Sequence, residues 1–435
     1  MLFKEIGLID EHFGYRENMY VGTVGNLIAY IDDKAPQNAE MYGEVYDGTD
    51  KVLMPGFYNA HAHSPMIPMR GYAENMNLQD WLDKWILPFE DELYPEGVYW
   101  STLLANAESM RNGIVSTTDM YFFLDDIVKA TSESGMKATI GRSVVSFGEP
   151  IEENYRLKEM CDSIEMYHGW ADGRIRTACD LHAEYTNDEA MIRKVAELAQ
   201  HYGVGIQVHC AETEHEVQGC IDRHGMTPVE FFNDCGILDS PANLAHCVWL
   251  TDRDVEILAD KKATVTSCPV SNLKLSSGIC DVNRLYNAGV NVAIGTDGVA
   301  SNNSLNFFEE MKLFALLGKY KTGPAAMPPE KVLYSATRAG ALAQGRTDCG
   351  LVKEGYKADM IVIDLGQPNM RPIHSVLNNL VFSADGKDVC LTMVDGQVLY
   401  RDGEYKTLDI EKVIAENDIV KNKMLDGVRA KNGKN

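Results

Sequence analysis

The sequence lacks several features that mark specialised classes of protein. Its ten cysteines are scattered from Cys161 to Cys390 without a C-x-x-C pair. Because a disulfide scaffold needs a short chain with dense cysteines, we expect reduced and mostly buried thiols. The opening stretch carries Glu5, Asp10 and Glu11 and lacks the apolar core of a signal peptide. No apolar run reaches the roughly 18 residues of a membrane span. These absences predict a soluble, cytoplasmic protein.

Positive charge is also scarce. Forty Lys and Arg residues stand against 64 Asp and Glu residues, which gives a net charge of −24 and a pI near 4.8. Such a surface repels phosphate backbones and anionic membranes, so we expect neither nucleic acid nor membrane as a partner. The chain has no G-x-G-x-x-G and no P-loop, so no nucleotide cofactor is predicted. Hydrophobic residues at 45% and charged residues at 24% are typical of a globular protein.

What the sequence does contain is a regular alternation of strand-like and helix-like stretches after Pro55. Eight apolar runs of strand length recur, each followed by a helical pattern: VLMPGFYNA, GIVSTTDMYF, KATIGRSVV, IRTACDLHA, GVGIQVHCA, ANLAHCVWL, ATVTSCPVS and VNVAIGTDG. This alternation predicts parallel βαβ units. A doubly wound sheet gives a similar string, but the count of eight favours a (β/α)₈ barrel of the TIM type.

Both ends of the chain are rich in short strands broken by Gly and Asp. We predict that residues 1–54 and 349–408 together form a small β-sandwich beside a barrel at 55–348, and that 409–435 form a C-terminal helix and tail. Two internal helices carry clear boundary signals. Asn187 is the expected N-cap and Gly203 the expected end of one, and Thr251 is the expected N-cap of another.

Metal-ligand residue types occur where the predicted strands end. In His61-Ala62-His63, two histidines at i and i+2 on a strand point to one face and can reach one ion. Alone this pattern is weak, and buried histidines are often satisfied core groups. Three further ligand types, however, end later strands: His209, His246 and Asp297. Because the carboxyl ends of barrel strands meet at one mouth, we expect these side chains to converge on one metal.

The motifs around these residues resemble those of a known superfamily. The segments MPGFYNAHAHSPM, HCAETEHE, LAHCVWL, CPVSNLKLSSG and GTDGVASNNSLNFFEEMK are similar to the amidohydrolase superfamily, and within it to the methylthioadenosine/S-adenosylhomocysteine deaminase branch. The tail GLVKEGYKADMIVIDL and VCLTMVDGQVLY is similar as well, so the resemblance covers nearly the whole chain.

The resemblance implies a site with one divalent metal, Zn²⁺ before Fe²⁺ or Mn²⁺, and four protein ligands: His61, His63, His209 and Asp297. The metal is expected to lower the pKa of a bound water toward neutrality. Glu212 corresponds to the proton shuttle and also contacts the substrate, His246 orients the water, and Asp297 accepts a further proton as ammonia leaves. Binuclear relatives use a carboxylated lysine at the end of the fourth strand. No lysine lies between Glu159 and Arg193, which favours a single metal.

Three residues are candidates for substrate binding. Glu90 corresponds to a carboxylate that binds ribose hydroxyls, although a solvated helix face is an alternative. Arg142 ends a predicted strand and is expected to bind the ribose or the 5′ substituent, with an ion pair to an acidic neighbour as the rival interpretation. His182 lies in DLHAEYT, where Glu184 replaces the proline of the branch. That replacement leaves the purine and ribose contacts open.

The leading functional prediction is hydrolytic deamination of S-adenosylhomocysteine, methylthioadenosine or a related adenosine. The alternative keeps the same metal site but acts on a free purine or pyrimidine base, or removes chloride or an amine from an s-triazine. A catalytically silent barrel that serves as a binding protein is a third possibility. The resemblance implies a small nucleoside substrate and a homo-oligomer.

Overall fold

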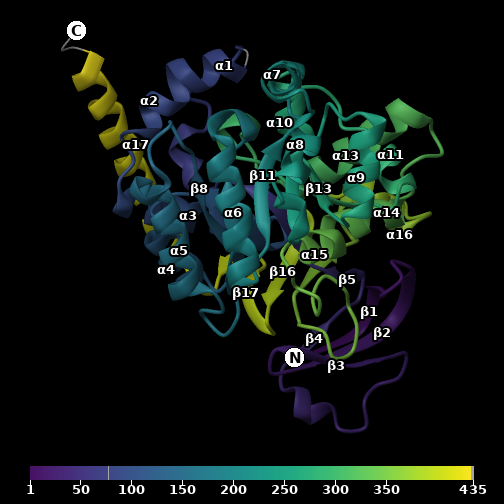
Figure 1. The fold of residues 1–435 in the computed structure, drawn as a ribbon. Helices are drawn as coiled ribbons and strands as arrows, with labels where there is room; N and C mark the ends of the chain where they lie inside the picture. Colours follow the sequence, from purple (N-terminus) through teal and green to yellow (C-terminus); the bar gives the residue numbers. More distant parts are fainter. Residues whose placement is uncertain (77, 433–435) are drawn as a thin grey trace.

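A barrel of parallel strands forms the centre of the computed structural model, which describes residues 1–76 and 78–432 (Figure 1). Neighbouring strands follow chain order, and the short strands β9 and β10 together occupy one strand position of the barrel, next to β8. An isolated parallel bridge between Ala62 and Asp297 connects the last barrel strand to the first, so the barrel is nearly closed. The strands are β6 (Phe57–Ala62), β7 (Ile114–Tyr121), β8 (Lys137–Val144), β9 (Ile175–Thr177), β10 (Cys179–Leu181), β11 (Ile206–Cys210), β12 (Ala242–His246), β13 (Thr264–Ser267) and β14 (Asn291–Ile294).

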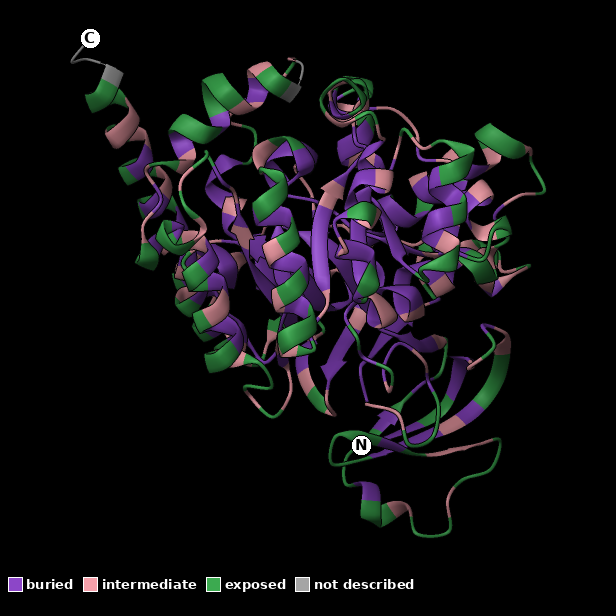
Figure 2. Ribbon diagram, viewed as in Figure 1, coloured by how far each residue is buried: buried purple, intermediate pink, exposed green. Residues whose placement is uncertain are grey.

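The barrel strands are buried along almost their whole length, whereas the helices around them are exposed on their outer faces (Figure 2). Strands covered on both faces are typical of parallel sheets, which explains the apolar runs in the sequence. The longer surrounding helices are α3 (Pro95–Arg111), α4 (Leu124–Ser134), α5 (Tyr155–Tyr167), α6 (Glu189–Tyr202), α7 (Glu214–His224), α8 (Pro228–Asp234), α9 (Asp252–Asp260) and α13 (Phe307–Thr322). Shorter helices are α1 (Leu78–Trp81), α2 (Leu87–Glu90), α10 (Pro269–Lys274), α11 (Val282–Asn287), α12 (Val299–Asn302), α14 (Pro329–Tyr334), α15 (Gly340–Ala343) and α16 (Val376–Phe382).

The helix boundaries test the capping signals. Thr251 caps α9 through a reciprocal capping box with Asp254, as predicted. Gly203 ends α6 with a φ of 66°, also as predicted. The prediction of Asn187 as the N-cap of α6 was wrong by one residue. The side chain of Asp188 accepts the hydrogen bond from the Met191 N–H, because a carboxylate is an equally good cap.

Strands from the two ends of the chain form a second, mixed sheet. Its order is β18-β17-β16-β15-β5-β1-β2-β3, with β4 paired to β1, and β5 and β15 join the two ends in antiparallel register. The turn between β16 and β17 is Asp395-Gly396, and both residues have the positive φ that a two-residue hairpin turn needs. The strands are β1 (Leu2–Ile9), β2 (Tyr15–Val24), β3 (Leu27–Asp32), β4 (Val45–Asp47), β5 (Lys51–Pro55), β15 (Met360–Asp364), β16 (Val389–Val394), β17 (Gln397–Arg401) and β18 (Glu404–Tyr405). The predicted combination of a barrel with a β-rich module from both chain ends is confirmed.

A buried ion cluster joins the amino ends of the barrel strands to the mixed sheet. Lys137, the first residue of β8, places Nζ 2.5 Å from Asp359 Oδ2 and 2.8 Å from Asp395 Oδ1. The hydroxyl of Tyr58 also donates to Asp359. We call Lys137, Asp359, Asp395 and Tyr58 the basal cluster. Because it links the barrel strands β6 and β8 to the segments beside β15 and β16, it holds the two sheets together.

The chain ends in the predicted helix, α17 (Ile410–Asn432), which packs beside α3 on the outside of the barrel (Figure 1). Asn417 of α17 donates to the carbonyl of Trp100 in α3 at 2.8 Å. None of the helices in the described part of the chain is long and apolar enough to cross a membrane.

Candidate active site

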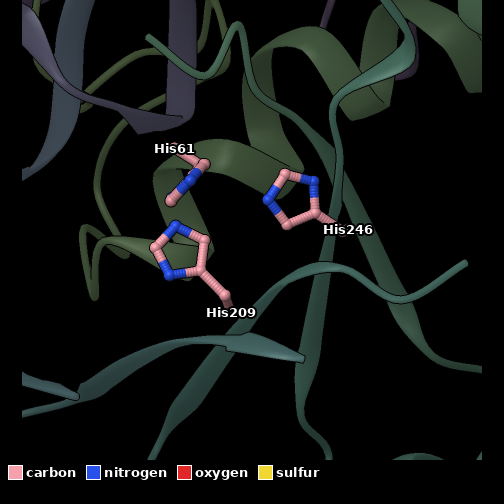
Figure 3. A group of neighbouring side chains, drawn as sticks. All are labelled: His61, His209 and His246. Atoms are coloured by element: carbon pink, nitrogen blue, oxygen red, sulfur yellow. The ribbon is translucent and has the colours of Figure 1, made fainter. Parts of the chain in front are cut away.

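Ligand-type side chains from four barrel strands meet at the carboxyl ends of those strands. His61, His209 and His246 come from β6, β11 and β12, and their imidazoles face one another (Figure 3). One nitrogen from each of these rings lies within 4.8 Å of the others. His63 and Asp297 form a second group with His61 at the same spacing. His61 therefore belongs to both groups, and all five side chains surround one centre.

The distances within this centre are short enough for shared ligation. The Nε2 atom of His63 lies 3.2 Å from Asp297 Oδ1, and that of His61 lies 3.6 Å from the same oxygen. The ring centroids of His61 and His209 are 4.8 Å apart. These spacings match side chains that can bind one ion at about 2 Å each.

Hydrogen bonds behind the imidazoles fix which nitrogen faces the centre. In three of the rings Nδ1 is paired with an oxygen outside the centre, so Nε2 is the atom left to face inward. The pairs are His63 with the Met120 carbonyl at 2.7 Å, His209 with the His182 carbonyl at 2.7 Å, and His246 with Asn272 Oδ1 at 2.8 Å. Such contacts orient metal-binding histidines in proteins generally.

The electrostatics of the centre attract positive charge. Burial acts to raise the pKa of Asp297, but the imidazoles of His61 and His63 hold it well below its usual range. Burial also acts against protonation of His63, yet the Asp297 carboxylate raises the pKa of His63 to about 9. Burial lowers the pKa of His61 to about 4, so this ring is a neutral nitrogen donor. A carboxylate surrounded by imidazoles favours a cation between them.

The residues fit a divalent metal. The Nε2 atom of His61 is buried and, among the described residues, has no hydrogen-bond partner. A buried nitrogen without a partner costs free energy that a metal bond would recover. Imidazole nitrogen together with carboxylate oxygen is a donor set that Zn²⁺, Fe²⁺ and Mn²⁺ all accept.

Glu212 lies beside this centre, in a turn that is stabilised by hydrogen bonds with neighbouring side chains. Its Oε1 atom accepts a 2.9 Å hydrogen bond from the Ser277 hydroxyl, and its Oε2 atom lies 3.8 Å from His246 Nε2. The carboxylate of Glu216 accepts the backbone N–H groups of Ala211 and Glu212 at 2.7 and 2.8 Å. Ala211 has a φ of 51°, an uncommon conformation for a residue with a side chain, which these bonds stabilise.

His182 lies beside the His209 ring of the centre, and Glu90 contacts Tyr121, whose ring neighbours that of His63. The hydroxyl of Tyr121, at the end of β7, donates to Glu90, and burial raises the pKa of the Glu90 carboxyl. The His182 ring centroid lies 5.0 Å from that of His209, and its Nδ1 is 3.1 Å from Thr186 Oγ1. Glu90 thus has a specific buried partner, which an exposed helix-face residue would lack.

Arg142 makes the ion pair that was the rival interpretation for this residue. Its Nε atom donates to Glu159 Oε2 at 2.6 Å, and Nη1 donates to the Ser143 carbonyl at 2.8 Å. The guanidinium also lies over the rings of Phe122 and Tyr155. The Glu159 side chain is half exposed. The substrate role of Arg142 stays a prediction.

Several residues at the site had no predicted role. Ser271 donates to Asp297 Oδ2 at 2.6 Å, and Ser301 lies 3.1 Å from the same oxygen. Ser277 binds Glu212, and Tyr121 binds Glu90. The segment CPVSNLKLSSG contains two of these serines, so it was the available signal, but it does not say which side chain each serine contacts.

Comparisons with known proteins agree with the motifs. Residues 52–399 match the model of the Amidohydrolase family. A 5′-deoxyadenosine deaminase of Methanosarcina mazei is 41% identical over 396 residues, or 91% of each chain. A 5-methylthioadenosine/S-adenosylhomocysteine deaminase of Pelotomaculum thermopropionicum is 40% identical over 375 residues, or 86% of each chain. The structure of an adenosine deaminase from Xanthomonas campestris with bound zinc superposes with a TM-score of 0.90 at 30% identity, covering 99% of this chain and 98% of that one. On this evidence the chain belongs to the amidohydrolase family.

Proposed function

We propose that the chain is a metal-dependent hydrolytic deaminase of adenosine derivatives. The observation that carries this proposal is the centre of four histidines and Asp297 with the carboxylate of Glu212 beside it. The relatives at 40 and 41% identity are named as deaminases of 5′-deoxyadenosine and of methylthioadenosine and S-adenosylhomocysteine, which supports the same substrate class here. Candidate substrates are therefore these three nucleosides.

The proposed metal ligands are His61, His63, His209 and Asp297. A divalent ion held by them supplies Lewis-acid activation of water near neutral pH. His246 then serves as an orienting group, because its Nδ1 is fixed by Asn272 and its Nε2 faces Glu212.

The proposed proton path runs through Glu212. Its carboxylate takes a proton from the attacking water and delivers it to a ring nitrogen of the adenine, while the water oxygen bonds to the amine-bearing carbon. Asp297 then takes the remaining proton from the added hydroxyl and passes it to the exocyclic nitrogen, and the bond from that nitrogen to the carbon breaks as ammonia leaves. Adenosine derivative and water thus yield the inosine derivative and ammonia.

Glu90 is the proposed ribose-binding residue. Its carboxylate accepts a hydrogen bond from Tyr121, whose ring centroid lies 6.3 Å from that of His63. His182 lies beside His209 and is proposed to contact the purine or ribose, and Arg142 to contact the 5′ side of the substrate.

The test is ammonia release from a panel of S-adenosylhomocysteine, methylthioadenosine, 5′-deoxyadenosine, guanine, cytosine and an amino-triazine. We expect turnover of adenosine derivatives alone, and none after chelation. Turnover of a free base or triazine alone would keep the metal chemistry but refute the nucleoside assignment. Silence across the panel in metal-loaded protein would refute the deaminase.

Glu90→Gln tests the ribose contact. We expect KM for the nucleoside to rise about tenfold or more, because a charge-assisted hydrogen bond is worth roughly 1.5–3 kcal/mol. Asp91→Asn is the matched control, since Asp91 is the exposed neighbouring carboxylate. Equal kinetics for the two variants would exclude a ribose-binding role for Glu90.

A further inference from the structure

Glu184 is a buried carboxylate in the 3₁₀ turn after β10, two residues beyond His182. Its Oε1 accepts a hydrogen bond from Arg223 Nε at 3.1 Å, and its Oε2 accepts one from Arg223 Nη2 at 2.7 Å. His224 Nε2 lies 3.1 Å from Oε1. Arg223 and His224 form the last turn of α7, so this contact ties the loop after one barrel strand to the helix after the next.

The turn held by Glu184 touches the active site at two points. The carbonyl of His182 lies 2.7 Å from His209 Nδ1 and accepts the backbone N–H of His209 at 3.1 Å. The His182 ring lies beside the His209 ring. Displacement of this turn would therefore move both the oxygen that orients a proposed metal ligand and a proposed substrate contact.

The helix on the other side of the contact is itself fixed to the site. Near its start, α7 supplies Glu216, which binds the backbone of Ala211 and Glu212. At its end, the His224 ring stacks on Phe231 of α8 with centroids 3.9 Å apart. Since α7 is held at both ends, it is a firm support for the turn after β10.

We propose that Glu184 is a positioning residue: through its buried ion pair with α7 it fixes the turn that places His182 and orients His209. The proposal rests on the proposed function for the substrate and for His209 as a metal ligand. Residue 184 is the first residue of the turn, where proline is favoured because its φ is preset, and Ala183 before it is extended. This chain fixes by a side-chain contact a turn that proline could fix through the backbone.

Exposure predicts an asymmetry between the two partners. The Glu184 side chain is 1% exposed, whereas that of Arg223 is 46% exposed. Without Arg223 the buried carboxylate keeps only His224, but without Glu184 the guanidinium can turn to water. Removal of the Arg223 guanidinium should therefore disturb the turn more than removal of the Glu184 carboxylate.

The experiment compares Glu184→Gln, Glu184→Pro and Arg223→Gln in zinc-loaded protein. The readouts are the rate of zinc release to a chelator and the separate values of KM and kcat. We expect both Gln variants to release zinc about tenfold faster and to raise KM more than they lower kcat, with the larger effect for Arg223→Gln. Glu184→Pro should bring both values back to within about threefold of wild type. Glu189→Gln, which breaks an exposed ion pair with Arg193, is the control and should match wild type.

Two results would overturn the proposal. If both Gln variants unfold more readily but release zinc at the wild-type rate with an unchanged KM, the ion pair is only structural. If Glu184→Pro is as impaired as Glu184→Gln, fixing the turn is not what matters. Should Arg223→Gln fail to fold, Glu184→Gln still removes the charge of the pair, and wild-type zinc release in that variant counts against the proposal. Zinc release needs no turnover, so an inactive wild type would refute the deaminase without touching this result.

Discussion

The two ends of the barrel both contain buried charged groups, but these groups are paired at one end and incompletely paired at the other. At the amino ends of the strands, Lys137 contacts two carboxylates, and Asp359 also receives a hydrogen bond from Tyr58. At the carboxyl ends, five ligand-type side chains face one centre, and the Nε2 atom of His61 has no hydrogen-bond partner among the described residues. At the amino ends the charged groups are paired with one another, whereas the groups at the carboxyl ends are arranged to receive a cation.

This difference separates residues that support the fold from residues that support chemistry. Burial and perturbed pKa values occur at both ends, so neither property identifies an active site by itself. What distinguishes the carboxyl ends is incomplete pairing around a shared centre. Substitutions at the amino ends should therefore change stability, and substitutions at the carboxyl ends should change activity.

The largest expected effect is that of Glu212→Gln. The amide keeps the shape but cannot take or give the proton, so we expect kcat/KM for the nucleoside to fall by about a thousandfold. Zinc content should be unchanged, because Glu212 is not a proposed ligand. Glu214→Gln, at an exposed position two residues later, serves as the control. A loss below tenfold would contradict the assignment of Glu212 as the proton shuttle.

Lys137→Met should act on stability instead. Removing one partner of a buried ion pair typically costs about 3–5 kcal/mol, because the other charge is left unpaired. We expect the free energy of unfolding in urea to fall by this amount while kcat/KM of the folded enzyme stays within about twofold. Lys129→Met, at an exposed lysine, is the matched control. A large loss of activity without a loss of stability would break the comparison between the two ends.

The basal cluster also predicts a pH dependence. Burial opposes both charges, but their attraction holds the pKa of Asp359 below, and that of Lys137 above, the usual values. The Asp359 contribution is present above about pH 4 and lost as pH falls further, and the Lys137 contribution is present below about pH 10 and lost as pH rises further. The free energy of unfolding of the wild type, measured in urea as a function of pH, should thus keep both contributions between these limits and lose one of them outside.

The smallest expected effect is that of Glu216→Gln, which sharpens the comparison within the active site. The amide can accept only one of the two backbone N–H groups that the carboxylate binds, so the turn carrying Glu212 should loosen. We expect kcat to fall about tenfold, with zinc affinity within twofold of wild type. Glu214→Gln again provides the reference. Equal kinetics for the two variants would show that the Glu216 hydrogen bonds are not needed to position Glu212.

The sequence sufficed for the barrel and for the ligand-type residues because their signals are local. His61-Ala62-His63 is a two-residue pattern on a strand, and His209, His246 and Asp297 each end an apolar run. The rule that strand ends converge does the rest.

Contacts between distant segments were beyond the sequence. The partners Glu90 and Tyr121 are 31 residues apart, Glu212 and Ser277 are 65 apart, and the Glu184–Arg223 pair spans 39. No periodicity encodes such pairs, because they depend on how neighbouring loops lie against each other. The exchange of one good cap for another at Asn187 and Asp188 shows the same limit at a helix boundary.

The antiparallel pairing of β5 with β15 has a consequence for how the protein is made. Met54 and Ile361 are register partners, yet about three hundred residues separate them in the chain. During synthesis at about 5–20 residues per second, the first strands emerge tens of seconds before their partners exist. Until β15 has been synthesised, β5 lacks this partner strand and its edge stays unpaired. We therefore expect the early strands to be the part of the nascent chain most prone to misassociation.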